Sequence, residues 1–180
     1  MSAHSSVRTY SDEALVGAWR QLHASGEWWN RRELLKSIFL SRLLNDNAPL
    51  IFEDGLQQRD LVSVYDVARA CRLALQSQEA EGAAYNIGSG NCYTIRDIAD
   101  QAARVVGKEH IQPEITGKYR VGDIRHCFAD NSRALEVLGY QPRVSLEEGL
   151  AELAEWVIDQ RPVDRVDQAG AELAARGLTV

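Results

Sequence analysis

The chain has 180 residues, of which 45% are hydrophobic and 26% charged, as in one ordinary globular domain. A domain of this length buries roughly 70% of its unfolded surface, so it can build a core without disulfides or metals. The formal net charge of −6 does not suggest the basic surface with which proteins bind nucleic-acid phosphates. We therefore expect no nucleic-acid partner.

The cysteines and histidines indicate neither a disulfide framework nor a metal site. Cys71, Cys92 and Cys127 are odd in number and far apart, and the four histidines lack metal-ligand spacing. No apolar run reaches the ~20 residues that span a bilayer, and the first residues do not resemble a signal peptide. These patterns predict a soluble, cytoplasmic protein without a membrane partner.

The first half of the chain predicts a helix followed by a short strand. Residues 1–30 lack a clean apolar period and stay unassigned, although Ser11 is suited to cap a short helix. Segment 32–44 repeats apolar residues at helical spacing and ends in an Asn-Asp-Asn sequence, which predicts an amphipathic helix. Segment 49–52 predicts a strand, closed by a Glu-Asp-Gly turn.

Extended runs and helices alternate in the middle of the chain. Segments 61–64 and 83–87 are expected to be strands, and the first leads into a helix with its cap at Tyr65 or Asp66. This alternation indicates an α/β fold, but the turns are too irregular for a complete doubly wound domain.

Two later helices begin with a capping box, in which a Ser or Thr and an acidic residue three positions on cap the helix reciprocally. Thr94 pairs with Asp97 in the first, and Ser145 with Glu148 in the second. The apolar stripe of the second helix includes Trp156, which is expected in the core. The tail, 161–180, is expected to form one short, loosely docked helix.

Two segments carry cations suited to a phosphate group. Arg59 lies between a polar turn and an extended run, where a guanidinium can grip a phosphate, although an ion pair with Asp60 or Asp66 is the commoner explanation. Segment 118–125 gathers three cations and one carboxylate around a glycine, a combination suited to a phosphate and a ribose hydroxyl. By itself it is more often a solvated loop.

A third candidate is the turn Gly88-Ser89-Gly90, between an expected strand and a helix. Backbone amides can cradle a phosphate at such a place. A dinucleotide fingerprint needs a third glycine where Tyr93 stands, so a plain tight turn is the preferred interpretation. No serine or cysteine nucleophile signature accompanies the histidines, so no catalytic residue is predicted.

Three stretches between Ser41 and Asp159 resemble, in order and spacing, the second half of the NAD-dependent epimerase/dehydratase family. They read SRLLNDNAPLIFEDGLQQRDLVSVYDVARACRLAL, AAYNIGSGNCYTIRDIAD and YRVGDIRHCFADNSRALEVLGYQPRVSLEEGLAELAEWV. These extended short-chain dehydrogenase/reductase proteins act on nucleotide sugars, and KYRVGDIRHCFAD is most similar to UDP-glucose 4-epimerase-like and dTDP-L-rhamnose 4-epimerase-like members. The resemblance implies that 31–160 form a helix-rich substrate-binding lobe with a few short strands, without the N-terminal Rossmann domain.

The resemblance also implies roles for five residues. Leu50 and Phe52 would line the pyrimidine base, partly through backbone groups, and Arg59 and Arg120 would contact the diphosphate. Asp123 would meet the ribose or the base side. The expected ligand is therefore a UDP- or dTDP-sugar.

The chain does not contain the family's catalytic and cofactor motifs. Its 180 residues include neither G-x-x-G-x-x-G nor Tyr-x-x-x-Lys. In the family the tyrosine removes a hydroxyl proton as NAD takes the hydride, so NAD belongs to full-length relatives and this chain is expected to be truncated and inactive alone. Two alternatives stay open: one subunit of a split epimerase/dehydratase, completed by a separate NAD-binding polypeptide, and a non-catalytic nucleotide-binding module. The partner is expected to be that polypeptide or a second copy of the chain in a homodimer.

Overall fold

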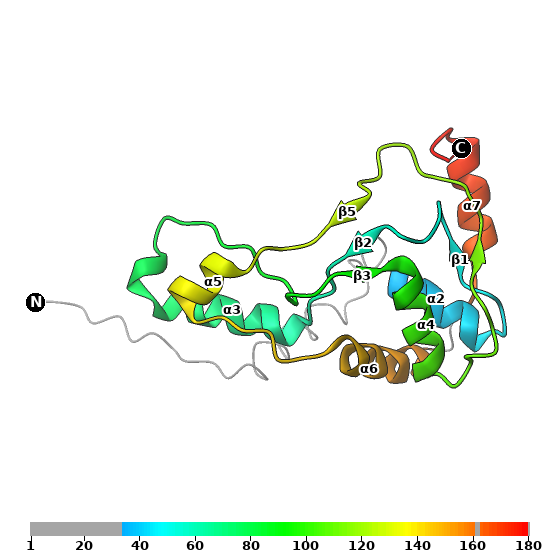
Figure 1. The fold of residues 1–180 in the computed structure, drawn as a ribbon. Helices are drawn as coiled ribbons and strands as arrows, with labels where there is room; N and C mark the ends of the chain where they lie inside the picture. The colour runs from blue at the N-terminus through cyan, green and yellow to red at the C-terminus, as the bar shows by residue number, and fades with distance from the viewer. Residues whose placement is uncertain (1–33, 161–162, 180) are drawn as a thin grey trace, which may run out of the picture.

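The computed structural model describes residues 34–160 and 163–179, and two groups of helices lie at its opposite ends with short strands between them (Figure 1). One group consists of α3 (Val64–Gln76) and α5 (Ser132–Leu138), with the 3-10 helix η1 (Gln78–Ala80) beside them. The other consists of α2 (Leu34–Leu44), α4 (Ile95–Val105) and α6 (Leu146–Asp159), and α7 (Val166–Ala175) follows near the C-terminus. The predicted helix-rich α/β lobe with short strands is confirmed.

The strands form two small sheets. β1 (Leu50–Ile51) pairs in parallel with β4 (Glu114–Ile115). The second sheet has the order β3-β2-β5, in which β2 (Gln58–Arg59) lies antiparallel to β3 (Tyr93–Thr94) and parallel to β5 (His126–Cys127). The parallel pairs bring the segments around 50 and 59 next to the segment between β4 and β5.

The larger core lies between α2, α4 and α6, which pack against one another through their apolar faces. Its buried side chains include Phe39, Leu40, Leu43, Ile51, Ile98, Leu150 and Val157. The prediction that Trp156 belongs to this core is wrong, because its side chain is 45% exposed. The buried positions of α6 are Leu146, Leu150, Ala154 and Val157, so the neighbouring Val157 takes the inward place on the helix.

Both predicted capping boxes are confirmed. The Asp97 amide donates to Thr94 Oγ1 at 3.0 Å, and the Thr94 amide donates to the Asp97 carboxylate at 2.9 Å. At α6 the Glu148 amide donates to Ser145 Oγ at 3.2 Å, and the Ser145 amide donates back at 2.8 Å. The Ser145 amide and hydroxyl lower the pKa of Glu148.

The structure differs from prediction on either side of α3. No strand forms over 61–64, because α3 begins at Val64 with Ser63 as its cap, whose Oγ accepts a hydrogen bond from the amide two residues on at 3.3 Å. Segment 83–87 is irregular rather than a strand. Neither segment pairs with a neighbouring strand in the described residues, so no ladder forms there. The predicted Ser11 helix lies outside the described residues.

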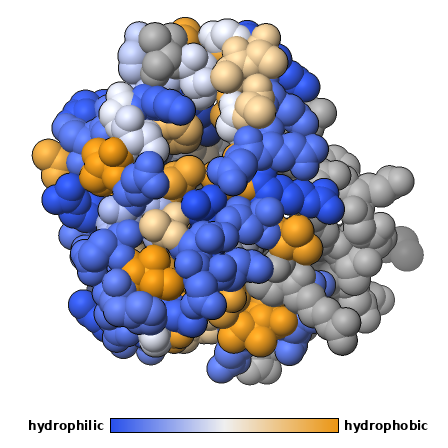
Figure 2. All heavy atoms as spheres, turned by 90° about the vertical axis from the view of Figure 1, so that its right-hand side faces the viewer, coloured by the Kyte–Doolittle hydropathy of each residue, from blue (hydrophilic) through white to orange (hydrophobic). Residues whose placement is uncertain are grey.

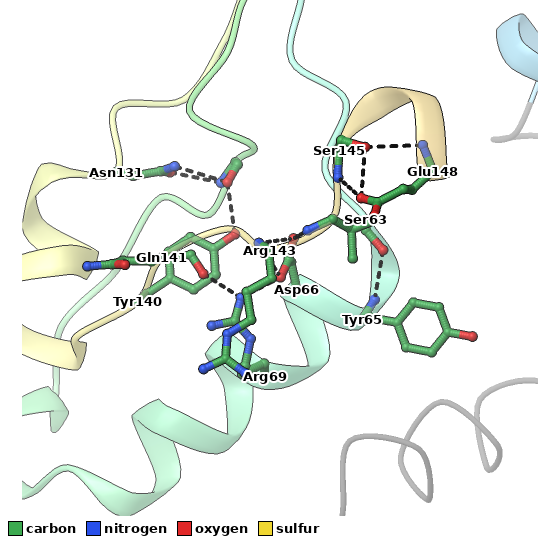
Figure 3. Close-up of polar contacts among 12 residues, drawn as sticks. Ser63, Tyr65, Asp66, Arg69, Asn131, Tyr140, Gln141, Arg143, Ser145 and Glu148 are labelled. Carbon is green, nitrogen blue, oxygen red and sulfur yellow. Dashed lines mark hydrogen bonds and ion pairs between the residues drawn. The ribbon is translucent and has the colours of Figure 1, made fainter. Parts of the chain in front are cut away.

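A buried carboxylate joins α3 to the segment that leads into α6 (Figure 3). Asp66, 1% exposed, accepts hydrogen bonds from the Arg143 amide at 2.9 Å and the Val144 amide at 3.1 Å. It also pairs with Arg69, whose guanidinium donates to the Gln141 carbonyl. Three donors from two elements thus converge on one side chain, which fixes how the two helix groups connect.

Tyr140 extends this network to the turn at Gly88 (Figure 3). Its ring lies 5.5 Å from the Arg69 guanidinium carbon, and its hydroxyl donates to the Gly88 carbonyl at 2.8 Å. Burial, followed by the charge of Asp66, raises the pKa of Tyr140 to about 12. Asn131 bonds the same glycine twice, accepting from its amide at 2.8 Å and donating to its carbonyl at 2.9 Å. Side chains of Tyr140 and Asn131 therefore hold the backbone at the predicted turn.

Within the described residues, none of the helices combines the length and apolar character needed to cross a membrane.

Replacing Asp66 with alanine should lower the free energy of unfolding by about 3 to 5 kcal/mol, because it leaves Arg69 as a buried, unpaired charge and two amides without an acceptor. Urea denaturation followed by circular dichroism measures the change. Asp66→Asn, which keeps one acceptor oxygen, should have an intermediate effect. Asp100 is exposed on α4, so Asp100→Ala is the control and should shift stability by less than about 0.5 kcal/mol. Equal losses for both alanine variants would contradict the role of Asp66.

Candidate functional site

One pocket brings together all five residues that the sequence singled out, from three separate segments of the chain, and a fourth segment adds Ile95 to its lining. It is lined by Leu50, Phe52, Gln57, Arg59, Ile95, Arg120 and Asp123. The two arginines, expected to share a phosphate group, thus lie at the same site rather than on opposite sides of the molecule.

The apolar wall of the pocket follows from the alternation of side chains along an extended backbone. Ile51 is 1% exposed and points into the main core, so Leu50 and Phe52 on either side of it point the other way. The Phe52 ring lies 5.9 Å from the guanidinium carbon of Arg120. This wall therefore offers an apolar surface with a cation beside it, which suits a flat heterocyclic ring.

Arg59 joins β2 to the loop over 118–125. Its guanidinium donates to the carbonyls of Gln58 and Arg125, both at 2.8 Å, and of Ile124 at 2.7 Å. A guanidinium has five N–H donors, so two are left for a ligand after these three bonds.

The ion pair that was the alternative for Arg59 is not what the structure shows. Asp66 is paired with Arg69, and Asp60 accepts from the amides of Ser89 at 2.8 Å and Ala129 at 3.4 Å. Carbonyl oxygens, not carboxylates, hold Arg59, so its positive charge is not neutralised by either predicted partner.

Arg120 and Asp123 form a pair at the edge of the pocket. The Arg120 Nε lies 2.8 Å and its NH2 2.7 Å from Asp123 Oδ2. A turn with Gly122 at φ 86° brings the two side chains together, and they remain 40% and 36% exposed. The pair is accessible to a ligand, and together with Arg59 it gives the pocket a formal charge of about +1.

Both ends of the same loop are held by the turn after β1. Arg125 contacts Glu53 and Asp54, each at 2.7 Å, and the Glu53 amide donates to the Lys118 carbonyl at 2.7 Å. The hydrogen bond from Arg125 is the largest cause that lowers the pKa of Asp54. Loop 118–125 is thereby fastened over the residues that follow Leu50 and Phe52.

Gln57 is the pocket residue that the sequence interpretation missed. It is 6% exposed, its side-chain Nε2 donates to the Phe52 carbonyl at 2.8 Å, and its backbone carbonyl accepts from the Ile95 amide at 3.0 Å. It therefore ties β1 to the start of α4. The signal available in the sequence was a polar side chain directly between two site segments, in the QQRD motif.

The turn Gly88-Ser89-Gly90 does not fit the pyrophosphate of NAD. The amides of Gly88 and Ser89 already donate to Asn131 and Asp60, both at 2.8 Å. A Cβ on Gly88 would lie 2.0 Å from an oxygen of Asp60, so glycine is required there by close packing. These contacts support the tight-turn interpretation.

The pocket is small for the ligand class that its residues suit. Its volume is about 30 Å³, whereas sites that enclose a small-molecule ligand hold ~300 to 1,000 Å³. The described residues therefore do not enclose a space of ligand size at this pocket.

Comparison with known proteins gives the family. The model of the GDP-mannose 4,6 dehydratase family matches residues 31–153. The dTDP-L-rhamnose 4-epimerase of Burkholderia thailandensis is 36% identical over 121 residues, which are 67% of this chain and 33% of that protein. The UDP-glucose 4-epimerase of Mycolicibacterium smegmatis is 38% identical over 120 residues, 67% of this chain and 37% of that protein. The chain spans about a third of the length of these curated relatives.

Solved structures show the same fold. The UDP-glucose 4-epimerase of Thermotoga maritima with UDP-glucose has a TM-score of 0.63 and 34% identity, over 70% of this chain and 40% of that one. The UDP-glucuronic acid 4-epimerase of Bacillus cereus, in complex with UDP-glucuronic acid and NAD, has a TM-score of 0.65 and 28% identity, over 72% of this chain and 41% of that one.

These matches define the class of protein as a lobe of the nucleotide-sugar 4-epimerase type. The chain belongs to the NAD-dependent epimerase/dehydratase family, as its motifs predicted.

Replacing Arg125 with glutamine should raise the pKa of Asp54 towards its ordinary value, because the main cause of the lowering is removed. Since the pKa of Asp54 is lowered in the folded state, its contact with Arg125 stabilises the fold above the ordinary pKa and is lost as pH falls through the lowered one. A carboxyl carbon NMR titration measures both values. The pKa of Asp130 is lowered by Ser132 instead, so Asp130 is the internal control and should titrate unchanged. An unaltered Asp54 titration would contradict the assigned pairing.

Proposed function

We propose that this chain binds a UDP- or dTDP-sugar at the pocket of Arg59 and Arg120. The observation that carries the proposal is the meeting of these two guanidinium groups, from separate segments, at the edge of an apolar wall made by Leu50 and Phe52. A pyrimidine nucleoside diphosphate has the same order of parts, a flat ring followed by a doubly charged phosphate group.

Each part of the ligand has a counterpart in the pocket. The base lies against Leu50 and Phe52, with backbone groups of this segment as hydrogen-bond partners. The diphosphate takes the two unused donors of Arg59 and the guanidinium of Arg120, which makes charge-assisted hydrogen bonds. Asp123 is placed to accept from a ribose hydroxyl while it orients Arg120. A related structure supports this ligand class, because the Thermotoga maritima epimerase was solved with UDP-glucose.

We further propose that the chain by itself holds the nucleotide sugar without converting it. The family's reaction needs NAD as hydride acceptor and a tyrosine that removes a hydroxyl proton, and these 180 residues contain neither the glycine-rich loop nor the Tyr-x-x-x-Lys pair. This chain's own residues bind and orient the nucleotide. Incubation of the purified chain with NAD and UDP-glucose should yield no epimer, and turnover would overturn this part of the proposal.

A second candidate is one subunit of a split epimerase/dehydratase, favoured by apolar side chains around the site loop. Val121 is 58% exposed, Ile124 66% and Phe128 56%. The fitting partner is a polypeptide with a glycine-rich NAD loop and a Tyr-x-x-x-Lys pair. A complex of defined stoichiometry that gains epimerase activity would favour this candidate, whereas a homodimer without activity or a monomer that binds UDP would favour a non-catalytic nucleotide-binding module.

Arg120→Ala should weaken the binding of UDP by ~10- to 100-fold, because a charge-assisted hydrogen bond contributes roughly 1.5 to 3 kcal/mol. Isothermal titration calorimetry of the full chain with UDP, in the absence of NAD, measures the change. Arg104 lies exposed in the last turn of α4, so Arg104→Ala is the matched control and should leave the affinity within about twofold.

The ligand series adds a second criterion that is independent of the substitution. UDP should bind more tightly than UMP or uridine, since each phosphate removed takes away acceptors for the two arginines. Equal affinities for uridine and UDP, or equal effects of Arg120→Ala and Arg104→Ala, would contradict binding of the diphosphate at this pocket.

A further inference from the structure

The C-terminal helix α7 is attached to the lobe by its ends rather than by its faces. It contains no buried residue, so hydrophobic packing contributes little to its placement. At its start, Asp164 accepts from the Val166 amide at 3.0 Å and from the side chains of Arg42 at 3.2 Å and Asn47 at 2.9 Å. These bonds connect the beginning of α7 to the end of α2.

The other end of α7 reaches the site loop. Gly177, at φ 65°, turns the chain back, and the Leu178 amide donates to the Leu173 carbonyl at 3.0 Å. The Leu178 carbonyl then accepts from the Val121 amide at 3.0 Å, and Thr179 forms an antiparallel bridge with Arg120. In Figure 1 the chain between β4 and β5 passes beside the C-terminal end of α7, as these contacts require.

The tail pairs with a part of the loop that is not held in place by burial. Residues 121–128 are all exposed, and Gly122 permits many backbone conformations. Figure 2 shows that the face with α7 and β1 carries separate apolar side chains among polar ones. Arg125 and Arg59 fasten the loop at 124–125, and the Glu53 amide holds it at the Lys118 carbonyl. Between these anchors, the tail pairs with the backbone of Arg120 and Val121.

We propose that Leu178 and Thr179 are positioning residues, whose backbone holds Arg120 and Asp123 over the apolar wall of the pocket. The tail pairs with the backbone of Arg120 and its neighbour while the side chain of Arg120 lines the pocket. Without this backbone pairing, the loop samples conformations in which Arg120 is away from the pocket. The apparent affinity for the ligand is then reduced by the fraction of time that Arg120 spends away from the pocket. The effect on binding rests on the proposed function; the effect on the loop does not.

Two variants remove the pairing from opposite sides. A chain that ends at Gly177 loses the acceptor at Leu178, and Val121→Pro loses the donor. The matched control is the double substitution Leu178→Ala with Thr179→Ala, which keeps every backbone atom of the pairing. Backbone amide exchange by NMR reports the loop without ligand, UDP calorimetry reports the site, and thermal unfolding by circular dichroism reports the fold.

In the shortened chain the Val121 amide should exchange about 10-fold faster. In both variants the affinity for UDP should fall about 3- to 10-fold, because one net hydrogen bond contributes about that much to binding. The unfolding midpoint should stay within a few degrees because α7 buries no residue, and the alanine control should match the unmodified chain in all three measurements. Unchanged exchange at Val121 after shortening overturns the proposal, as does faster exchange with unchanged affinity for UDP.

The two proposals fail in different ways. If the unmodified chain binds no UDP, the proposed function is wrong, and the exchange of Val121 alone then decides whether the tail holds the loop. If UDP binds and Arg120→Ala weakens it while the shortened chain binds normally, the site is correct and the positioning role of the tail is wrong.

Discussion

The arrangement of the lobe depends on one buried carboxylate. Asp66 lies near the start of α3 and collects the Arg69 guanidinium and the amides of Arg143 and Val144. Without these partners its charge would be too costly to bury, and with them it fixes the path of the chain from one helix group to the other. Tyr140 and Asn131 continue the same network to Gly88, so the segment between η1 and β3 is held by side chains where no strand forms.

The site depends partly on polar contacts at the surface, whereas the core depends on apolar burial. Its apolar wall is rigid because Ile51, between Leu50 and Phe52, is buried in the core, and this burial fixes the direction in which the side chains of Leu50 and Phe52 point. Its charged half sits on an exposed loop, held at one end by Arg59 and Arg125 and near Arg120 by the tail. Polar anchors of this kind contribute about 1 kcal/mol each and compete with water, so the cationic half of the pocket is easier to displace than the apolar half.

Charge within the pocket is partly compensated before any ligand arrives. Arg120 is paired with Asp123, whereas Arg59 is held by carbonyl dipoles and keeps its charge unneutralised by Asp60 or Asp66. A diphosphate that binds Arg120 therefore has to share it with a carboxylate. The volume of the pocket, about 30 Å³, is also too small to enclose such a ligand.

Local patterns were enough to predict the features that depend on neighbours in the sequence. Both capping boxes, the helix after Thr94 and the α/β character follow from spacing and side-chain chemistry within a few residues. The family resemblance supplied the five pocket residues, and the motifs that carry it lie within single segments. The strands predicted at 61–64 and 83–87 were wrong because a ladder exists only where another strand runs alongside, and neither segment pairs with one in the described residues.

The sequence alone determined which side chains this lobe carries and where its capped helices begin. Only the tertiary structure decided that Arg59 is held by loop carbonyls, that Gln57 completes the pocket and that the tail pairs with Arg120. The physical reason is that these contacts join residues far apart in the chain, and the geometry between such residues is set by the packing of whole elements rather than by local preference.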